Sequence, residues 1–190
     1  MIVDYRRATP EDSVFIKEVA GHSLVRRNNP DTRLFCHWLD RYMTGDNRHD
    51  GLCHTHFLVT CNGLAVGHVA EYLYDREVRH GNAPPGRVCY VGFDIHPDFW
   101  GRGIMKSALR RYIDDGFEDQ RFSQLISECL TTNSRCRRLL EGLGFQSPSV
   151  GLPDQLWTMW KYKGLSPKAR YGYAHEEWSN DSRQESAEGK

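Results

Sequence analysis

The sequence predicts an α/β domain with a mixed, mostly antiparallel sheet and helices on both faces. Three observations favour this class: strand-like and helical patterns mix along the 190 residues, a hairpin signal lies mid-chain, and helical segments join the late strands. The length suits one domain over residues 1–163. A polar, charged tail over 164–190 follows, and we expect its end to be mobile.

The first segments predict a strand and two helices. Residues 3–8 alternate in hydropathy, as in a half-buried strand. Thr9 can then cap a helix whose first turn suits Pro10, and apolar residues recur behind them at helical spacing. The same spacing predicts a second helix over 31–43, with Leu34, Trp38 and Tyr42 on one face. Residues 45–51 are polar and predict a loop.

A hairpin is the clearest local signal. Asn-Gly at 62–63 separates two strand-like runs, 57–61 and 64–74, and this dipeptide favours a tight hairpin turn. Residues 53–56 read Cys-His-Thr-His, but no second ligand pair follows at zinc-finger spacing, so we expect no metal and a polar loop that enters the strand. Charges, prolines and glycines predict a loop over 75–86.

The second half alternates strands with helical crossovers. Apolar runs predict strands, and core spacing predicts helices. The expected strands are 87–95, 125–130 and 155–162, with one more short strand after Phe145 as an option, and the expected helices are 103–117 and 133–143.

Composition restricts the class of protein. Basic and acidic residues balance at 25 each, so no global field recruits nucleic acid or an anionic membrane. No apolar run approaches the ~20 residues of a membrane span, and the N-terminus lacks the apolar middle of a signal peptide, which predicts a cytoplasmic protein. The six scattered cysteines suit small buried hydrophobes rather than a disulfide framework.

One stretch of the sequence, at residues 95–105, indicates a binding site. A strand runs into Pro97, and Trp100-Gly101-Arg102-Gly103-Ile104-Met105 then opens a helix. Backbone N–H groups at a helix start lack helical partners and can bind an anion, and the two glycines leave room for a phosphate. A Gly-x-Gly after a strand is often only a tight turn. The dinucleotide fingerprint would need a third glycine where Lys106 stands.

This stretch resembles the pyrophosphate-binding motif of the GNAT superfamily of acetyltransferases. Ile95-His96-Pro97 looks like the family's Val-x-Pro, and residues 100–105 occupy the place of its Gln/Arg-x-x-Gly-x-Gly/Ala. Downstream, 133–136 and 140–145 look like its second motif, Asn-x-x-Ser/Ala running to Gly-Phe. The resemblance covers roughly 3–162. The Trp-Gly-basic-Gly-Ile-Met turn is similar to the ribosomal-protein N-terminal acetyltransferases of the RimJ and RimL type.

The resemblance implies the GNAT (acyl-CoA N-acyltransferase) fold. It also implies direct transfer of the acetyl group of acetyl-CoA to a primary amine, preferably a peptide or protein N-terminal amine, and it leaves a homodimer open. The sheet should splay at Ile95, whose backbone N–H would stabilise the oxyanion. The implied cofactor-binding residues are Ile95, His96, Trp100, Gly101, Arg102, Gly103, Ile104, Met105, Asn133 and Cys136.

Glu128 is the preferred candidate for the base that deprotonates the amine. It sits five positions before Asn133, like a glutamate proposed as the base in RimI-type enzymes, and an acid inside a strand is unusual. A solvent-facing or ion-paired glutamate is the alternative. Asp94 and His96 are runners-up, and alternation places them opposite the side chain of Ile95.

The sequence departs from the family pattern at several positions, and these departures leave other functions open. Leu140 stands where many members place a tyrosine proposed to protonate the thiolate, so another group or water must do so. Cys136 replaces the usual Ser or Ala and suits packing rather than nucleophilic attack. Arg135, Arg137 and Arg138 either meet the 3′-phosphate of CoA or form a solvated face. The rival functions are a small-molecule amine acetyltransferase (aminoglycoside, polyamine or amino acid) and a non-catalytic acyl-CoA-binding protein.

Overall fold

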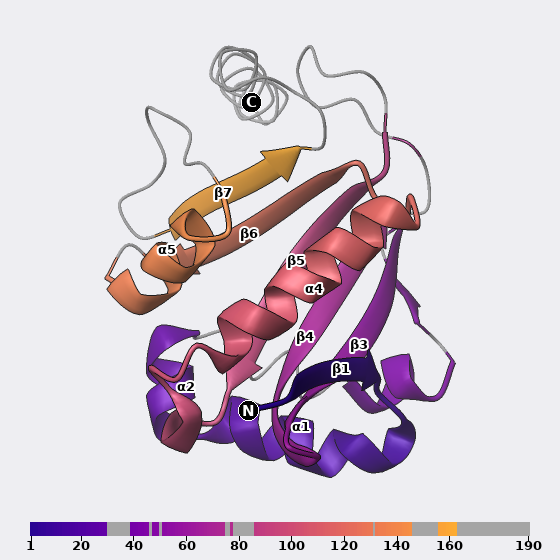
Figure 1. Cartoon of the computed structure of the whole chain (residues 1–190). Coiled ribbons are helices and arrows are strands. Elements are labelled where there is room, and N and C mark those ends of the chain that lie inside the picture. Colours follow the sequence, from indigo (N-terminus) through magenta and orange to yellow (C-terminus); the bar gives the residue numbers. More distant parts are fainter. Residues whose placement is uncertain are drawn as a thin grey trace, which may run out of the picture.

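One sheet organises the fold (Figure 1). The computed structural model describes residues 1–29, 39–45, 47–49, 51–74, 77, 86–130, 132–145 and 156–162. Its strands are β1 (Val3–Arg7), β2 (Arg48–His49), β3 (Leu52–Cys61), β4 (Leu64–Tyr74), β5 (Val88–Ile95), β6 (Gln124–Leu130) and β7 (Leu156–Tyr162). Its helices are η1 (Pro10–Asp12), α1 (Ser13–Gly21), α2 (Ser23–Asn28), η2 (Pro97–Phe99), α4 (Ile104–Glu118) and α5 (Ser134–Glu141), with a further helical turn at 39–43.

The strand order is β1-β3-β4-β5-β6-β7, with β2 on the edge of β3. Every pair is antiparallel except β5 and β6, which run parallel because α4 crosses between them. Asn62 and Gly63 both have positive φ angles, 50° and 81°, as the predicted hairpin turn requires. The predicted mixed, mostly antiparallel sheet is confirmed.

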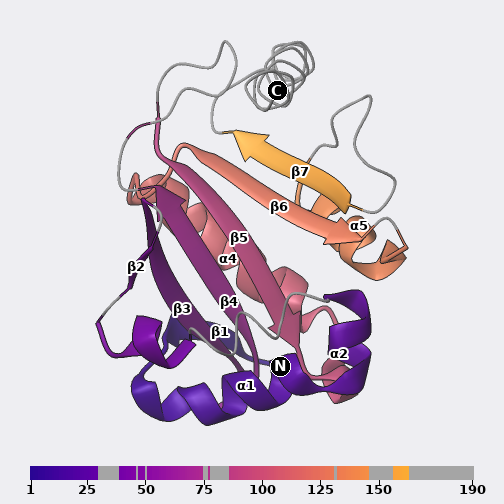
Figure 2. The same cartoon turned by 180° about the vertical axis from the view of Figure 1, so that it is seen from behind.

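Helices cover both faces of the sheet. The side chains of α4 and α5 pack on one face in the larger core, which includes Leu109, Tyr112 and Leu140. On the other face Ile16 of α1 packs with Leu39 and with Leu58 of β3. Figure 2 shows α1 and the turn at 39–43 in front of the sheet and α4 behind it. The predicted two-sided arrangement is therefore confirmed.

A charged network crosses the larger core. The Tyr112 hydroxyl donates to Oε2 of Glu71 at 2.7 Å, and Nη1 of Arg121 donates to the same oxygen at 3.1 Å. The Arg121 guanidinium also lies 5.1 Å from the ring centre of Tyr112 and 5.6 Å from that of Phe122. The Glu71 carboxylate therefore balances the positive charge of the Arg121 guanidinium, which packs against aromatic rings.

Replacing Glu71 with Gln is expected to lower the free energy of unfolding by about 3 kcal/mol, because the largely buried Arg121 would lose its counter-ion. Urea denaturation followed by circular dichroism measures the change. Glu118→Gln, on the exposed side of α4, is the matched control and should change stability by less than about 0.5 kcal/mol. Equal stability of the two variants would contradict this role of Glu71.

Two loop predictions were wrong. Residues 53–56 belong to β3, because the strand pairs with β4 as far as Leu52, and the loop predicted at 45–51 contains β2. His54 and His56 are buried in β3, and the Tyr42 ring stacks on His54 at 4.0 Å. Burial lowers the pKa of His56 to about 3, so this ring is neutral at pH 7. Among the residues that the structure describes, no three metal-ligating side chains cluster.

Some predictions fall outside the described residues. These are Leu34 and Trp38 of the second helix, nearly all of the loop at 75–86, the short strand after Phe145, and the tail 164–190. The short helix α2 was not predicted as a separate element. It begins where His22 turns the chain, and the His22 ring accepts the Leu24 N–H at 3.2 Å. None of the described helices is long and apolar enough to cross a membrane.

Candidate active site

The sheet splits between its two parallel strands. Pairing of β5 with β6 runs only from Val88 opposite Gln124 to Tyr90 opposite Ile126, although both strands continue. Where they separate, Ser127 Oγ donates to the Val91 carbonyl at 2.9 Å. The predicted splay is confirmed, and it begins after Tyr90, before the strand reaches Ile95.

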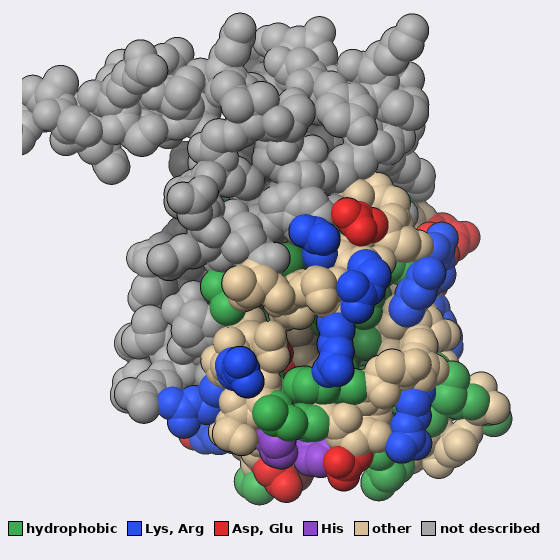
Figure 3. All heavy atoms as spheres, turned by 90° about the vertical axis from the view of Figure 1, so that its left-hand side faces the viewer, with side chains coloured by type: hydrophobic (Ala, Val, Ile, Leu, Met, Phe, Trp, Pro, Cys, Tyr) green, Lys and Arg blue, Asp and Glu red, His purple; other side chains and the backbone are tan. Residues whose placement is uncertain are grey.

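A pocket of about 930 Å³ occupies this split, lined by residues of α2, β5, β6 and the first turns of α4 and α5. Lys106, Arg135 and Arg138 are among its lining residues. Figure 3 shows Lys and Arg side chains gathered around a hollow on this face of the molecule. The part of the pocket near these three basic side chains is therefore suited to an anionic ligand.

The unpaired edge of β5 presents backbone donors to the pocket. The His96 N–H donates to the Val66 carbonyl at 2.8 Å, on the β4 side. Because N–H groups alternate along a strand, those of Phe93 and Ile95 point the other way. In the described part of the chain, β6 no longer pairs with them there. The edge can therefore bind an extended amide-bearing ligand as a strand would, and the role of the Ile95 N–H as oxyanion donor stays a prediction.

Gly67 is a residue that the sequence reasoning missed. It lies opposite Ile95, and a Cβ on it would come within 2.5 Å of the Asp94 carbonyl oxygen. Only glycine lets β4 and β5 approach so closely at the pocket. A glycine inside a predicted strand indicates such a close approach, so this role of Gly67 could have been predicted from the sequence.

The glycine turn has the geometry that the sequence predicted. Gly101 and Gly103 both have φ of 75°, a left-handed conformation that favours glycine, and a Cβ on either would point into open space. The first helical bond of α4 runs from the Ser107 N–H to the Gly103 carbonyl at 3.0 Å. The N–H groups of residues 104–106 therefore have no helical partner and can bind an anion.

Trp100 holds this turn against β5. Its indole Nε1 donates to the Ile95 carbonyl at 2.8 Å, and the Arg135 guanidinium lies 5.0 Å from the centre of its ring. The sequence placed Trp100 among the implied cofactor-binding residues, at the position of the family's usual Gln or Arg. The structure gives Trp100 a positioning function, because its side chain contacts both β5 and α5 and so holds the glycine turn between them.

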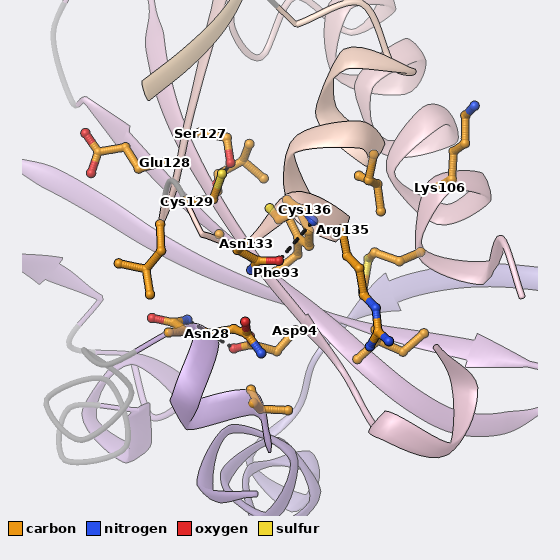
Figure 4. A pocket seen from close by; sticks show the side chains of 18 of the residues that line it. Asn28, Phe93, Asp94, Lys106, Ser127, Glu128, Cys129, Asn133, Arg135 and Cys136 are labelled. Carbon is orange, nitrogen blue, oxygen red and sulfur yellow. Dashed lines mark hydrogen bonds between the residues drawn. The ribbon is translucent and has the colours of Figure 1, made fainter. Parts of the chain in front are cut away.

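The start of α5 forms the opposite wall. Asn133 caps the helix, and its Oδ1 accepts the Cys136 N–H at 3.1 Å (Figure 4). The amide nitrogen of Asn133 can still donate into the pocket, which it lines. Cys136 also lines the pocket, and Leu139, one turn later, packs against the core.

Two carboxylates line the described part of the pocket, Asp94 and Glu128. Burial raises the pKa of Asp94 to about 6, and the Asn29 amide donates to its Oδ2 at 3.5 Å. Glu128 is exposed, and in Figure 4 its carboxylate points away from Asn133 and Cys136. Asp94 lies on the α2 side of β5 and Ile95 packs on the α4 side, as alternation predicted.

The structure does not bring every predicted side chain into the pocket. His96 and Arg102 are absent from its lining: His96 Nδ1 accepts the Asp98 N–H at 3.4 Å, and Arg102 lies over the Phe99 ring. Their contact with a cofactor stays a prediction. Leu140 is fully buried in the core, so its position offers no proton donor to the pocket. The predicted residues that do line it are Ile95, Trp100, Gly101, Gly103, Ile104, Met105, Glu128, Asn133 and Cys136.

Comparison with solved structures shows the same fold in several acetyltransferases. The aminoglycoside acetyltransferase AAC(6')-Ib in complex with coenzyme A is 16% identical with a TM-score of 0.65, over 85% of this chain and 95% of that one. An aminoglycoside N(6')acetyltransferase from Legionella pneumophila is 12% identical with a TM-score of 0.66, over 84% and 91%. A spermidine N-acetyltransferase SpeG chimera from Vibrio cholerae and hSSAT is 14% identical with a TM-score of 0.61, over 84% and 95%.

Sequence comparison identifies the family. No curated protein sequence is significantly similar to the chain. The model of the acetyltransferase (GNAT) domain family matches residues 4–146, which hold the split sheet, the glycine turn and the start of α5. The chain therefore belongs to the GNAT family of acetyl-CoA-dependent N-acetyltransferases.

Proposed function

We propose that this protein transfers the acetyl group of acetyl-CoA to a primary amine, with a peptide or protein N-terminal amine as the preferred acceptor. The observation that carries the proposal is a pocket with two chemically different ends in a split sheet. Lys106, Arg135 and the glycine turn line one end. Asp94, which lies on the α2 side of β5 and close to Tyr72, lines the other together with the phenols of Tyr72, Tyr74 and Tyr90.

The first end suits the cofactor. The pyrophosphate would lie on the N–H groups of residues 101–105, where the positive end of α4 favours negative charge. The basic side chains at the mouth suit the remaining phosphate. The pantetheine amides would pair with the free edge of β5 at Phe93 and Ile95, and Asn133 can donate to them from the opposite wall.

The second end suits an amine. We propose Asp94 as the group that accepts the amine proton, because a pKa of about 6 leaves it ionised but basic at pH 7. Glu128, the choice from sequence, is the second candidate. The deprotonated amine attacks the thioester carbon directly, and the Ile95 N–H stabilises the oxygen that becomes negative. The CoA thiolate then leaves and takes a proton from another group or from water, because Leu140 has no proton to donate.

The acceptor preference follows from charge. Aminoglycosides and polyamines carry several positive charges, whereas the described pocket lining offers two carboxylates, one of them exposed. That balance favours an acceptor with one ammonium group. An α-amine has a pKa of ~7.7–8.0 against ~10.4 for lysine, so far more of it is already the free nucleophile at pH 7. The resemblance to the RimJ and RimL branch points the same way.

A pair of peptides tests this preference. One has a free N-terminus and no lysine, and the other has the same sequence, an acetylated N-terminus and one lysine. At pH 7 the first is expected to be acetylated at least about tenfold faster, measured by mass spectrometry of the products. Faster modification of the blocked lysine peptide would refute the preference.

A small-molecule amine is the second candidate acceptor. It is favoured by the structural likeness to AAC(6')-Ib, whose solved structures include a complex with kanamycin. Kanamycin and spermidine therefore belong in the same assay. Turnover with either of them, and with neither peptide, would replace the peptide proposal by this one.

A further inference from the structure

We propose that Cys129 and Cys136 form an oxidisable thiol pair inside the pocket, and that a bound CoA ligand protects the pair from oxidation. Cys129 lies near the end of β6 and Cys136 in the first turn of α5, and both line the pocket. Figure 4 shows their sulfur atoms beside each other. The protection rests on the proposed function, whereas the reactivity of the pair does not.

The two thiols have different chemical roles. The two side chains are close enough to interact, and this interaction lowers the pKa of Cys129 from its ordinary value. The same interaction and burial raise the pKa of Cys136. Cys129 therefore ionises more readily. Because the thiolate is the nucleophile, Cys129 reacts first and Cys136 is the resolving thiol.

The other described cysteines lack this arrangement. Cys89 is fully buried, with Sγ 3.7 Å from the Tyr112 hydroxyl, and burial raises its pKa. Cys53 and Cys61 lie on β3 and do not line the pocket. In the described part of the chain, the pair at 129 and 136 therefore combines a thiol partner with access from the pocket.

The oxidant required is a hydroperoxide. The Cys129 thiolate attacks the terminal oxygen of hydrogen peroxide, the O–O bond breaks, and a sulfenic acid forms with release of one water after proton uptake. The Cys136 sulfur then attacks the sulfenic sulfur, forms the disulfide and releases a second water. Two thiols lose two electrons in total, and one peroxide gains them.

The disulfide would disturb ligand binding. It holds its sulfur atoms at about 2.05 Å, closer than two unbonded thiols, and so draws the first turn of α5 toward β6. That turn carries the cap formed by Asn133 and the pocket-lining Arg135. The oxidised protein should bind a CoA ligand about tenfold more weakly, equivalent to one weakened charge-assisted hydrogen bond.

Peptide mapping tests the pair directly. The full-length protein is treated with hydrogen peroxide, with and without desulfo-CoA, which has no thiol of its own. Trypsin cuts after Arg135, so the disulfide links peptides 122–135 and 136–137 covalently. We expect this link to form, to be removed by dithiothreitol, and to form about tenfold more slowly with desulfo-CoA at ten times its Kd.

Variants and calorimetry make each outcome decisive. Cys129→Ser and Cys136→Ser should abolish the link, and Cys61→Ser should retain it. Failure of the native protein to form the link overturns the thiol pair. An unchanged rate of oxidation, while calorimetry shows the ligand bound, overturns the protection. Absence of binding in calorimetry refutes the proposed function and the protection together, and the peptide link still decides the thiol pair.

Discussion

Acetyl-CoA is expected to bind the Gly103→Val variant about 100-fold more weakly than the native protein, because valine would cost at least two N–H contacts to the pyrophosphate. A β-branched residue is strained at the φ of 75° that Gly103 adopts, and its side chain would fill the open space above the turn. Isothermal titration with acetyl-CoA measures the loss of affinity.

The matched control for this variant is Gly63→Val. Gly63 also has a positive φ, 81°, with open space at its Cβ, but it lies in the turn between β3 and β4, away from the pocket. It should lose comparable stability and keep native affinity. Native affinity in a folded Gly103→Val protein would refute the placement of the pyrophosphate on this turn.

Asp94→Asn is expected to lower kcat by about 10²–10⁴-fold, the usual range for loss of general-base assistance. The affinity for acetyl-CoA should stay close to native, because we propose that Asp94 contacts the amine and not the cofactor. Glu128→Gln is the direct comparison, and we expect a much smaller effect on kcat. A large effect of Glu128→Gln with little effect of Asp94→Asn would return the role to Glu128.

The pH profile distinguishes a base from a structural residue. The pKa of Asp94 is raised to about 6, so its protonated, inactive form accumulates as the pH falls below that value. In the native enzyme kcat/KM should therefore decline below pH 6, in addition to the decline due to protonation of the free amine. Asp94→Asn should lose this step near pH 6 and keep the one due to the amine.

The sequence predicted those parts of the fold that local patterns specify. The glycine turn at 101–103 was predictable because left-handed backbone and an open helix start need glycine. The hairpin at Asn62 and Gly63 was predictable for the same reason. Burial of His54 and His56 was not predictable, because histidine is polar and only the folded structure shows the Tyr42 ring stacked on His54.

The candidate site was predictable in outline but not in its acid–base chemistry. The sequence ranked Glu128 above Asp94 because a strand glutamate is unusual. The burial of Asp94 raises its pKa, and this burial depends on how β5 and α2 come together. Similarly, the Trp100 bond to the Ile95 carbonyl and the contact of Cys129 with Cys136 join residues on different elements. The spacing of residues along the chain does not predict such contacts.

Release of free CoA from acetyl-CoA, in the presence of a mixed panel of peptide and small-molecule amines, tests the central claim most directly. We predict that CoA appears at the same rate as one acetylated amine of the panel, and that Gly103→Val lowers both rates about 100-fold when acetyl-CoA is below its native Kd. Binding of acetyl-CoA in the pocket with no CoA released for any amine would contradict the claim, and would make this chain an acyl-CoA-binding protein without catalysis.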